Sequence, residues 1–466
     1  MNKLSSSFQT FRGVFPSLFG EGWRGAAGSR VGVRLFPLFL FLFSSTLLSA
    51  QGIRIYKTDG TSSDIPVSDI DRIECLEDIA RPDEVVSMYV DYLGYTIPGD
   101  REPRSAVSVR LVSDGGSELF SAEGGMRVRG NSTSTLEKQP WDIKLNEKAS
   151  LLGMPKGKRW VLLANYWDRT NLRNDVGLEI ARRTKGMAWN PRSQYVRLYR
   201  EGKYEGLYLL CEKIKIAKER IDIPELSTSD IKEPEITGGY LLEFDYTDDE
   251  ISYTTEKFHY DVKIKEPDAP TKEQSNYIID YLNTLERLLK SFSQVSQQAY
   301  AQYIDIDSFI DFWLVGELVM NKDFNGPASC YMYKDRGGKL YAGPVWDLDL
   351  YTFSASVHNV NQFLLKDYCL YYSALFSDPA FTQRAKERWQ TLKASLENGY
   401  SIYDYIDDRS ALIADDVAAD DAAYPNRKYG NVRSGDEKVP FTEAVGMMKD
   451  FLTKRIAALD KLINGL

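Results

Sequence analysis

The sequence has few histidines and few cysteines: among 466 residues there are 2 His and 4 Cys. The cysteines are far apart and form no CxxC pair: Cys75, Cys211, Cys330 and Cys369. These shortages exclude a zinc ribbon and any chemistry built on several histidines. We expect buried free thiols, although export of the chain would permit one disulfide. The chemistry must therefore depend mainly on carboxylates, lysines and hydroxyls.

The chain also lacks an excess of basic residues. It has 58 Lys+Arg against 67 Asp+Glu, a formal net charge of −9. This balance argues against a broad basic face, so we expect no nucleic-acid partner. Because 43% of the residues are hydrophobic, a mainly disordered chain is excluded. The length indicates about two to three packed units.

An apolar run, Leu35 to Leu48 (LFPLFLFLFSSTLL), ends shortly before Ala50. Three arginines precede it: Arg24, Arg30 and Arg34. A basic segment, a short apolar core and small residues at a cut site are typical of a secretory signal peptide, and the run is short for a membrane span. We expect residues 1–50 to be a signal peptide cleaved near Ala50. The mature chain would then be secreted, periplasmic or on the cell surface, with no stable membrane span. An uncleaved N-terminal anchor is the alternative.

The mature chain changes character along its length. Residues 51–79 form a predicted small β unit with a hairpin at Asp59 and Gly60, and strand-type residues dominate 86–145. Further strands are predicted at 195–199, 206–210, 239–245, 331–333 and 340–345, and helices at 169–183, 273–292, 306–320 and 442–463. This order predicts an α+β fold with two lobes, a β-rich N-terminal lobe and a helical C-terminal lobe.

Three acidic side chains are candidate catalytic or metal-binding groups. Asp323 follows the predicted helix 306–320 within the segment NKDFN, where it can accept a proton or position a metal. Asp347 and Asp349 follow the predicted strand 340–345, and two such carboxylates suit Mg²⁺ when phosphate oxygens complete its shell. The alternatives are a polar loop capping the helix for Asp323, and a solvated loop or a glycosidase acid pair for Asp347 and Asp349.

Basic residues and hydroxyls in the β-rich half are candidate phosphate-binding groups. The segment RVRGNSTST places Arg129 before a hydroxyl-rich turn, and Lys138 and Lys144 follow it. Such a turn, with lysines on the return strand, can hold phosphate oxygens, or it is a flexible polar hairpin. Glu212 ends another predicted strand beside a lysine, and such a pair is usually a surface ion pair.

Taken together, these segments resemble the CotH kinase family, the atypical protein kinases similar to spore coat protein H. The resemblance covers roughly Ser87 to Phe353. It rests on an ordered series in which RVRGNSTSTLEKQPWDIKL comes first and PVWDLD comes last. The members of the series are residues 127–145, 158–174, 195–212, 239–243 and 344–353. No single segment is decisive, but the order is specific.

The resemblance implies an exported kinase with a two-lobed, kinase-like fold that transfers the γ-phosphoryl group of ATP to Ser or Thr of a protein substrate. Residues 86–360 would form the core, and 361–466 the helical remainder of the second lobe. The expected cofactors are ATP and Mg²⁺, with Mn²⁺ as a substitute, and the expected partner is a protein rich in Ser and Thr. Phosphoryl transfer needs a cation on the phosphates and carboxylates that hold the metal, so the residue types agree with this reading.

The same resemblance gives roles to individual residues. Asp323 would be the catalytic carboxylate. Asp347 would bind the metal, with Asp349 supporting it. Lys138 would contact the nucleotide phosphates, with Lys144 as the competing choice and Arg129 as a further cation of the cleft, and Glu212 would be the acidic partner on a neighbouring strand. We therefore expect Asp323, Asp347, Lys138 and Glu212 to line one cleft.

One departure from the family pattern bears on activity. The family commonly has an Asn, a natural second metal ligand, shortly before its YLY strand. Here that stretch is Gly326 to Cys330 (GPASC), and Asn325 is the residue that could substitute. A catalytically weak or inactive interaction protein on the same fold is therefore the second hypothesis. A carbohydrate-active enzyme using Asp347 and Asp349 is the third.

Overall fold

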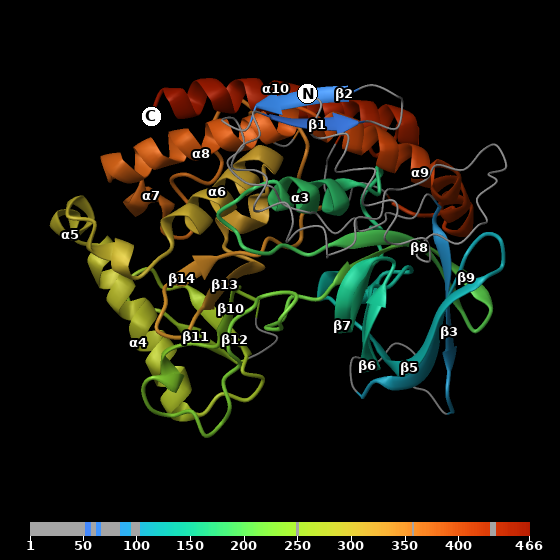
Figure 1. The fold of residues 1–466 in the computed structure, drawn as a ribbon, viewed down its shortest axis with the longest axis horizontal. Helices are drawn as coiled ribbons and strands as arrows, with labels where there is room; N and C mark the ends of the chain where they lie inside the picture. Colours follow the sequence, from blue (N-terminus) through green and yellow to red (C-terminus); the bar gives the residue numbers. More distant parts are fainter. Residues whose placement is uncertain are drawn as a thin grey trace, which may run out of the picture. The chain divides into compact units, whose positions relative to one another are not determined.

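The computed structural model (Figure 1) describes residues 52–56, 62–66, 84–94, 103–247, 251–356, 358–428 and 435–466. The chain divides into two compact units, Met1–Glu77 and Asp78–Leu466. In the first unit, β1 (Gly52–Tyr56) pairs antiparallel with β2 (Ser62–Pro66), as predicted for the hairpin. The predicted signal peptide and Cys75 lie outside the described residues. No helix in the described ranges is both long and apolar enough to cross a membrane.

A closed barrel of seven strands begins the second unit. Its order is β3-β4-β5-β6-β7-β9-β8, and it closes where β3 pairs with β8 in parallel, while the other neighbours are antiparallel. The strands are β3 (Val86–Tyr92), β4 (Ser105–Val112), β5 (Glu118–Val128), β6 (Trp141–Leu151), β7 (Met154–Leu163), β8 (Ser193–Arg200) and β9 (Lys203–Glu212). They run from blue to green in Figure 1.

Alternation along the strands fills the barrel with apolar side chains, and on β6 it leaves polar side chains outside. On β6, Trp141, Ile143 and Leu145 belong to the barrel core. Asp142 and Lys144, between them, therefore lie on the outer face. The outer face of β9 is apolar and belongs to a second, larger hydrophobic core shared with the helices. This arrangement places one wall of the barrel against the rest of the unit.

A second sheet of five strands follows the barrel in the chain. Its order is β11-β12-β10-β13-β14, all antiparallel. The strands are β10 (Tyr240–Phe244), β11 (Ser252–Thr254), β12 (Asp261–Glu266), β13 (Cys330–Lys334) and β14 (Leu340–Ala342). The strands predicted at 239–245, 331–333 and 340–345 are confirmed, whereas β11 and β12 were not predicted. All residues of β10 are buried.

Helices make up most of the remainder, so the predicted α+β class is confirmed. The α-helices are α3 (Arg173–Arg182), α4 (Lys272–Leu289), α5 (Phe292–Ser296), α6 (Ile306–Val319), α7 (Tyr372–Leu375), α8 (Pro379–Glu397), α9 (Ile402–Ala423) and α10 (Phe441–Asn464). The 3₁₀ turns are η4 (Ser132–Thr135), η5 (Glu235–Thr237), η6 (Ala299–Gln302) and η7 (Lys322–Asn325). Helix α6 is almost wholly buried and contacts α3, α8 and α10, and α9 contacts β9 (Figure 1).

Capping groups fix where the central helices begin. The Thr271 hydroxyl accepts a hydrogen bond from the backbone N–H of Gln274, whose side chain accepts one from the backbone N–H of Thr271. Asp305 caps α6 by accepting from the backbone N–H of Ser308 at 2.9 Å. These bonds satisfy N–H groups that a helix start otherwise leaves unpaired.

The described cysteines behave as the sequence predicts. Cys211, Cys330 and Cys369 are free and buried. Burial raises the pKa of the Cys330 thiol well above its ordinary value, and a hydrogen bond with Cys369 adds to that rise. These three residues therefore act as small apolar groups in the core.

Candidate functional site

The end of α6 positions the first acidic residue of the site. Met320 closes the helix in the left-handed region, with φ 55° and ψ 53°, and turns the chain toward Asn321 and Asp323. The Asn321 side chain accepts from the backbone N–H of Asp323 at 3.0 Å and donates to the backbone carbonyl of Asp347, also at 3.0 Å. One buried amide therefore fixes the Asp323 loop against the Asp347 loop.

Ser329 links Asp347 to another carboxylate, Asp245. Its hydroxyl donates to Asp347 Oδ2 at 2.7 Å, and its backbone N–H donates to Asp245 Oδ2 at 3.3 Å. The pairing of Phe244 with Cys330 between β10 and β13 brings the ends of these strands together. Ser329, Asp347 and Met320 all have positive φ although none is glycine. Such strained positions gather at functional sites.

The negative charge of these loop carboxylates is greater than the positive charge that neighbouring side chains place beside them. Burial raises the pKa of Asp323 to about 6, and the charges of Asp347 and Asp245 add to that rise. Burial raises the pKa of Asp349 to about 7, with Asp347 and Asp168 adding to it. Burial also raises the pKa of Asp347, although Arg129 and the Ser329 hydroxyl oppose it. The cluster is therefore suited to binding a cation.

The part of the chain that the structure describes holds no complete metal site made of protein side chains. Within the described residues, no group of three or more His, Cys, Asp or Glu side chains could hold a metal ion. Mg²⁺ in phosphate-handling sites commonly takes only one or two carboxylates and completes its shell with phosphate oxygens and water. Asp347 and Asp349, with Asp245 beside them, are the residues that could provide such a partial set.

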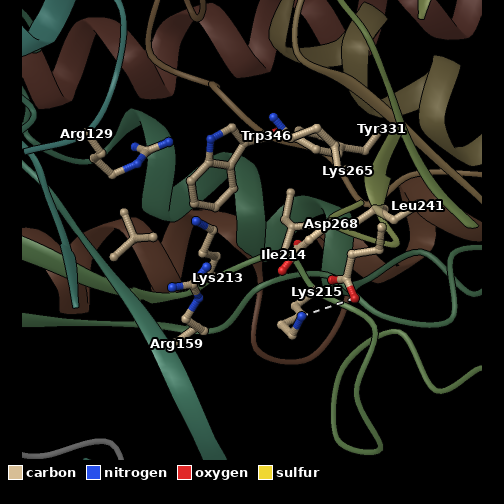
Figure 2. Close-up of a pocket in the computed structure, with 12 residues that line it drawn as sticks. Arg129, Arg159, Lys213, Ile214, Lys215, Leu241, Lys265, Asp268, Tyr331 and Trp346 are labelled. Carbon is tan, nitrogen blue, oxygen red and sulfur yellow. Dashed lines mark hydrogen bonds and ion pairs between the residues drawn. The ribbon is translucent and has the colours of Figure 1, made fainter. Parts of the chain in front are cut away.

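A pocket rich in cations adjoins these loops. It lies between the outer wall of the barrel and the five-stranded sheet, and Figure 2 shows its side chains. Its charged lining residues are Arg129, Arg159, Lys213, Lys215, Lys265, Glu266 and Asp268. Trp346 and Tyr331 also line it, and the Arg129 guanidinium lies 5.5 Å from the centre of the Trp346 ring. Because Trp346 precedes Asp347, the pocket and the acidic loops meet here.

Lys213 is fixed in the pocket by a buried carboxylate. Its Nζ lies 2.6 Å from Oδ2 of Asp142. Arg104 lies 3.1 Å from Oδ1 of the same carboxylate, and Arg127 lies 3.6 Å from Oδ2. Burial lowers the pKa of Lys213 to about 8, although Asp142 opposes that change. Asp142 therefore gathers cations on the barrel wall, and Lys213 presents its amine beside Trp346 (Figure 2).

The structure brings some of the predicted residues together. Asp323, Asp347 and Asp349 lie in one cluster, and Arg129 adjoins it. Asn325 ends η7, the turn that carries Asp323. These residues keep their predicted roles as hypotheses that the geometry permits.

Lys138 lies elsewhere, contrary to the expectation of one cleft. Its side chain is 0% exposed, and its Nζ donates to the carbonyl of Leu207 at 2.6 Å and pairs with Asp420 of α9 at 2.7 Å. Burial lowers its pKa to about 8. Helix α9 therefore covers the lysine that the sequence favoured for the phosphates, and a fully buried amine in an ion pair cannot contact a nucleotide.

Glu212 and Lys144 also lie away from the cation pocket. Glu212 is fully buried and holds Arg192 through two hydrogen bonds of 2.8 and 3.0 Å. Strand alternation turns Glu212 to the opposite side from Lys213. Lys144 is exposed on β6 and lines a separate groove with Arg104 and Lys158. Of the four residues expected in one cleft, only Asp323 and Asp347 are together.

Sequence reasoning missed Asp245, Ser329, Arg159 and Lys265, and it considered Lys213 only as the partner of Glu212 in a surface ion pair. Asp245 is the last residue of a strand that was predicted, so its position at a strand end was a readable signal. Lys213 and Lys215 alternate with isoleucines just after β9. That alternation indicated two cations on one face, but nothing local indicated that the face meets Trp346.

Comparison with known proteins adds one finding. None of the curated proteins compared with the chain matches it. The model of the family described as CotH kinase protein matches residues 126–459, more than half of the chain. The match includes the acidic loops, the cation pocket and the helices behind them. The chain belongs to the CotH kinase family.

Proposed function

We propose that this protein is an exported atypical protein kinase of the CotH type that uses Mg²⁺ and ATP to phosphorylate Ser or Thr of a protein. One observation carries the proposal: an under-neutralised carboxylate cluster and a cation-lined pocket meet at Trp346 and Asp347. Family membership supports a kinase-like reading of this arrangement. In this reading, the barrel is the N-terminal lobe and the helical region with the second sheet is the C-terminal lobe.

The residues of the acidic loops fit a divalent metal. The raised pKa values of Asp323 and Asp349 reflect burial and repulsion by Asp347, which a bound cation would relieve. Asp347 and Asp349 would hold Mg²⁺, and Asp245 would hold Ser329 and the neighbouring backbone in place. Mg²⁺ would neutralise charge on the phosphates of ATP.

The residues of the pocket fit the phosphates of ATP. Arg129 and Lys213 present cationic groups on either side of Trp346 in Figure 2, and Arg159 lies close to Lys213. Planar guanidinium groups suit phosphate oxygens, while the lysine amine acts as a point charge. In this proposal Lys213 takes the role that the sequence assigned to Lys138.

Asp323 is suited to accept the proton of the substrate hydroxyl. Its pKa of about 6 leaves it ionised at neutral pH, yet basic enough to take a proton. The Asn321 amide fixes the loop that carries it. Asp323 would orient the hydroxyl and receive its proton as the hydroxyl oxygen attacks the γ-phosphorus.

A second candidate function, a weak or inactive interaction protein, is favoured by Ser329. This residue lies in the stretch Gly326 to Cys330, where the family commonly has an Asn shortly before its YLY strand, and its hydroxyl donates to Asp347. Without the amide oxygen of that Asn, the second metal position would be weaker. Loss of catalysis with retention of the fold would leave a binding module.

The deciding experiment measures nucleotide binding and transfer in the same protein. Calorimetric titration of the mature chain with ATP should show binding that requires Mg²⁺, and labelled ATP should label a Ser/Thr-rich protein. Asp347→Asn should reduce transfer by about 10³-fold, since it removes a charge that holds the metal.

Asp415→Asn is the matched control, because Asp415 is an exposed carboxylate on α9. It should leave both measurements unchanged. Mg²⁺-dependent ATP binding without any transfer, including to the protein itself, would favour the interaction protein. Absence of ATP binding with both Mg²⁺ and Mn²⁺ would reject the kinase.

A further inference from the structure

A second groove on the outer wall of the barrel is also cationic. Its charged lining residues are Arg104, Lys144 and Lys158, and no acidic residue lines it. Gly124 and Gly125 form part of its floor. A Cβ atom on Gly125 would lie 3.0 Å from Cβ and 3.3 Å from Cδ of Arg104. The missing side chain therefore lets Arg104 lie across the sheet and reach Asp142.

This groove and the cation pocket lie on neighbouring strands of the same sheet. Lys144 on β6 and Arg159 on β7 are direct cross-strand partners, and Arg104 and Lys213 share Asp142. Like charges directly opposite one another destabilise a sheet. We call the residues Arg104, Lys144 and Lys158 the cationic strip.

The charge of the residues that line the groove and the pocket contrasts with the net charge of the whole chain. Among the residues that line the pocket and the groove, eight are cationic and two are acidic, while the chain carries a net charge of −9. A surface that concentrates cations at a local cost to sheet stability is suited to an anionic partner.

We propose that the strip docks an acidic segment, rich in Asp and Glu, of the protein that this chain binds. The assignment of that partner as the phosphorylated substrate rests on the proposed function. Docking itself does not, because it needs neither ATP nor the acidic loops. Arg159, the cross-strand partner of Lys144, lines the pocket, so a docked segment would hold the partner close to Asp347 and Asp323.

A peptide fits the groove better than a nucleic acid does. None of the residues that line the groove is aromatic, whereas single-stranded nucleic acids are usually held by stacking on aromatic side chains. A long polyanion would also meet the excess negative charge of the remaining surface, while a short acidic segment contacts only the strip.

The test is a binding measurement by fluorescence anisotropy. The probes are a short labelled peptide rich in Asp and Glu with one Ser, the same peptide with Asn and Gln in place of the acids, and a single-stranded RNA of equal length. The acidic peptide should bind most tightly and should weaken as salt is raised.

Two charge-matched variants make the measurement specific. In the strip variant, Lys144→Glu is combined with Lys158→Glu. The control combines Lys203→Glu with Lys454→Glu, two exposed lysines outside the strip. Affinity for the acidic peptide should fall by about tenfold or more in the strip variant and little in the control. Equal losses in both variants, equal binding of the neutral peptide, or tighter binding of RNA would overturn the proposal.

The same peptides separate docking from catalysis. In a transfer assay, Lys158→Glu should raise KM for a substrate with acidic flanks and leave the affinity for ATP unchanged. If no transfer occurs in the unmodified chain, the kinase proposal fails while the anisotropy result still decides docking. Loss of ATP affinity in Lys158→Glu would instead assign the groove to the nucleotide.

Discussion

Two groups of charges in this protein differ in how they are neutralised. In the first group, every buried charge has an opposite partner at short range. Arg455 lies 2.8 Å from Glu317, and Arg409 lies 2.7 Å from Asp175. In the second group, the half-buried Asp323, Asp347 and Asp349 have raised pKa values, and the charge of Asp347 adds to the rise at Asp323 and at Asp349.

The difference separates structural ions from functional ones. A buried charge without a partner costs several kcal/mol, so a fold retains it only where something else compensates. The paired residues hold helices to the barrel and to each other. A bound metal cation would neutralise the carboxylates of the second group. Anionic phosphates would neutralise the cations gathered around Asp142. Lys138 belongs to the first group. Its position in the motif led to the prediction that it contacts the nucleotide phosphates, because the motif does not show its burial.

The largest expected effect tests that assignment of Lys138. Lys138→Met leaves Asp420 with Arg427 but without its lysine partner, so the free energy of unfolding should fall by about 3 kcal/mol, at the low end for a broken buried pair. Urea unfolding of the unliganded protein measures this loss. Affinity for ATP, measured on the folded fraction, should stay unchanged.

A double variant sharpens the same test. Adding Asp420→Asn to Lys138→Met removes the unbalanced charge and should recover part of the lost stability. If Lys138→Met instead weakens ATP binding without a change in stability, Lys138 is a nucleotide ligand and the grouping proposed here is wrong.

A smaller effect is expected from replacing Lys213, the cation that takes the proposed role of Lys138 at the phosphates. Lys213→Met should weaken ATP binding by about 10- to 30-fold, the loss of one charged hydrogen bond. Stability should change less than for Lys138→Met, because Arg104 and Arg127 remain near Asp142. Calorimetric titration measures the affinity, with Lys454→Met as the control.

The pH dependence of the same binding tests the role of Lys213 independently. Burial lowers the pKa of Lys213 to about 8, so the charged amine is lost as pH rises through that value. Affinity for ATP should therefore fall above pH 8 in the unmodified chain. A fall of the same size in Lys213→Met would show that another group causes it.

The last expected effect concerns the acids of the second group. The pKa of Asp349 in the folded state, about 7, is above the ordinary value of 3.8, so ionisation opposes folding progressively as pH rises from about 4 to 7. Asp349→Asn should therefore stabilise the unliganded protein by roughly 1 to 3 kcal/mol at pH 8 and by less at pH 5. Thermal unfolding at both pH values measures it, with Asp415→Asn as the control. Destabilisation at pH 8 would place Asp349 among the paired charges.

Local patterns predicted much of the secondary structure. The helix predicted at 306–320 is α6, and the one predicted at 442–463 is α10, because apolar spacing along a helix needs only neighbouring residues. The closure of the barrel was beyond such patterns. Val86 of β3 pairs with Val196 of β8 in parallel, and no local signal connects strands so distant in the sequence.

The site was predictable on its acidic side and less so on its basic side. Asp323, Asp347 and Asp349 each follow a helix or strand whose end the sequence shows. Lys138 and Lys213 have similar surroundings in sequence, and only the packing of α9 against β9 determines that the first is buried and the second is open to the pocket.

The parallel closure of the barrel also determines which fragment can be produced as a soluble protein. The family match begins at Met126, inside β5, so a fragment cut there would lose β3, β4 and most of β5. Strand β8 would then have a bare edge, and the apolar interior that Val86, Met88 and Val90 fill would be open. Bare edges and open cores drive chains to pair with one another. The start of the family match shows where the shared sequence begins. A fragment that resists aggregation must begin before β3.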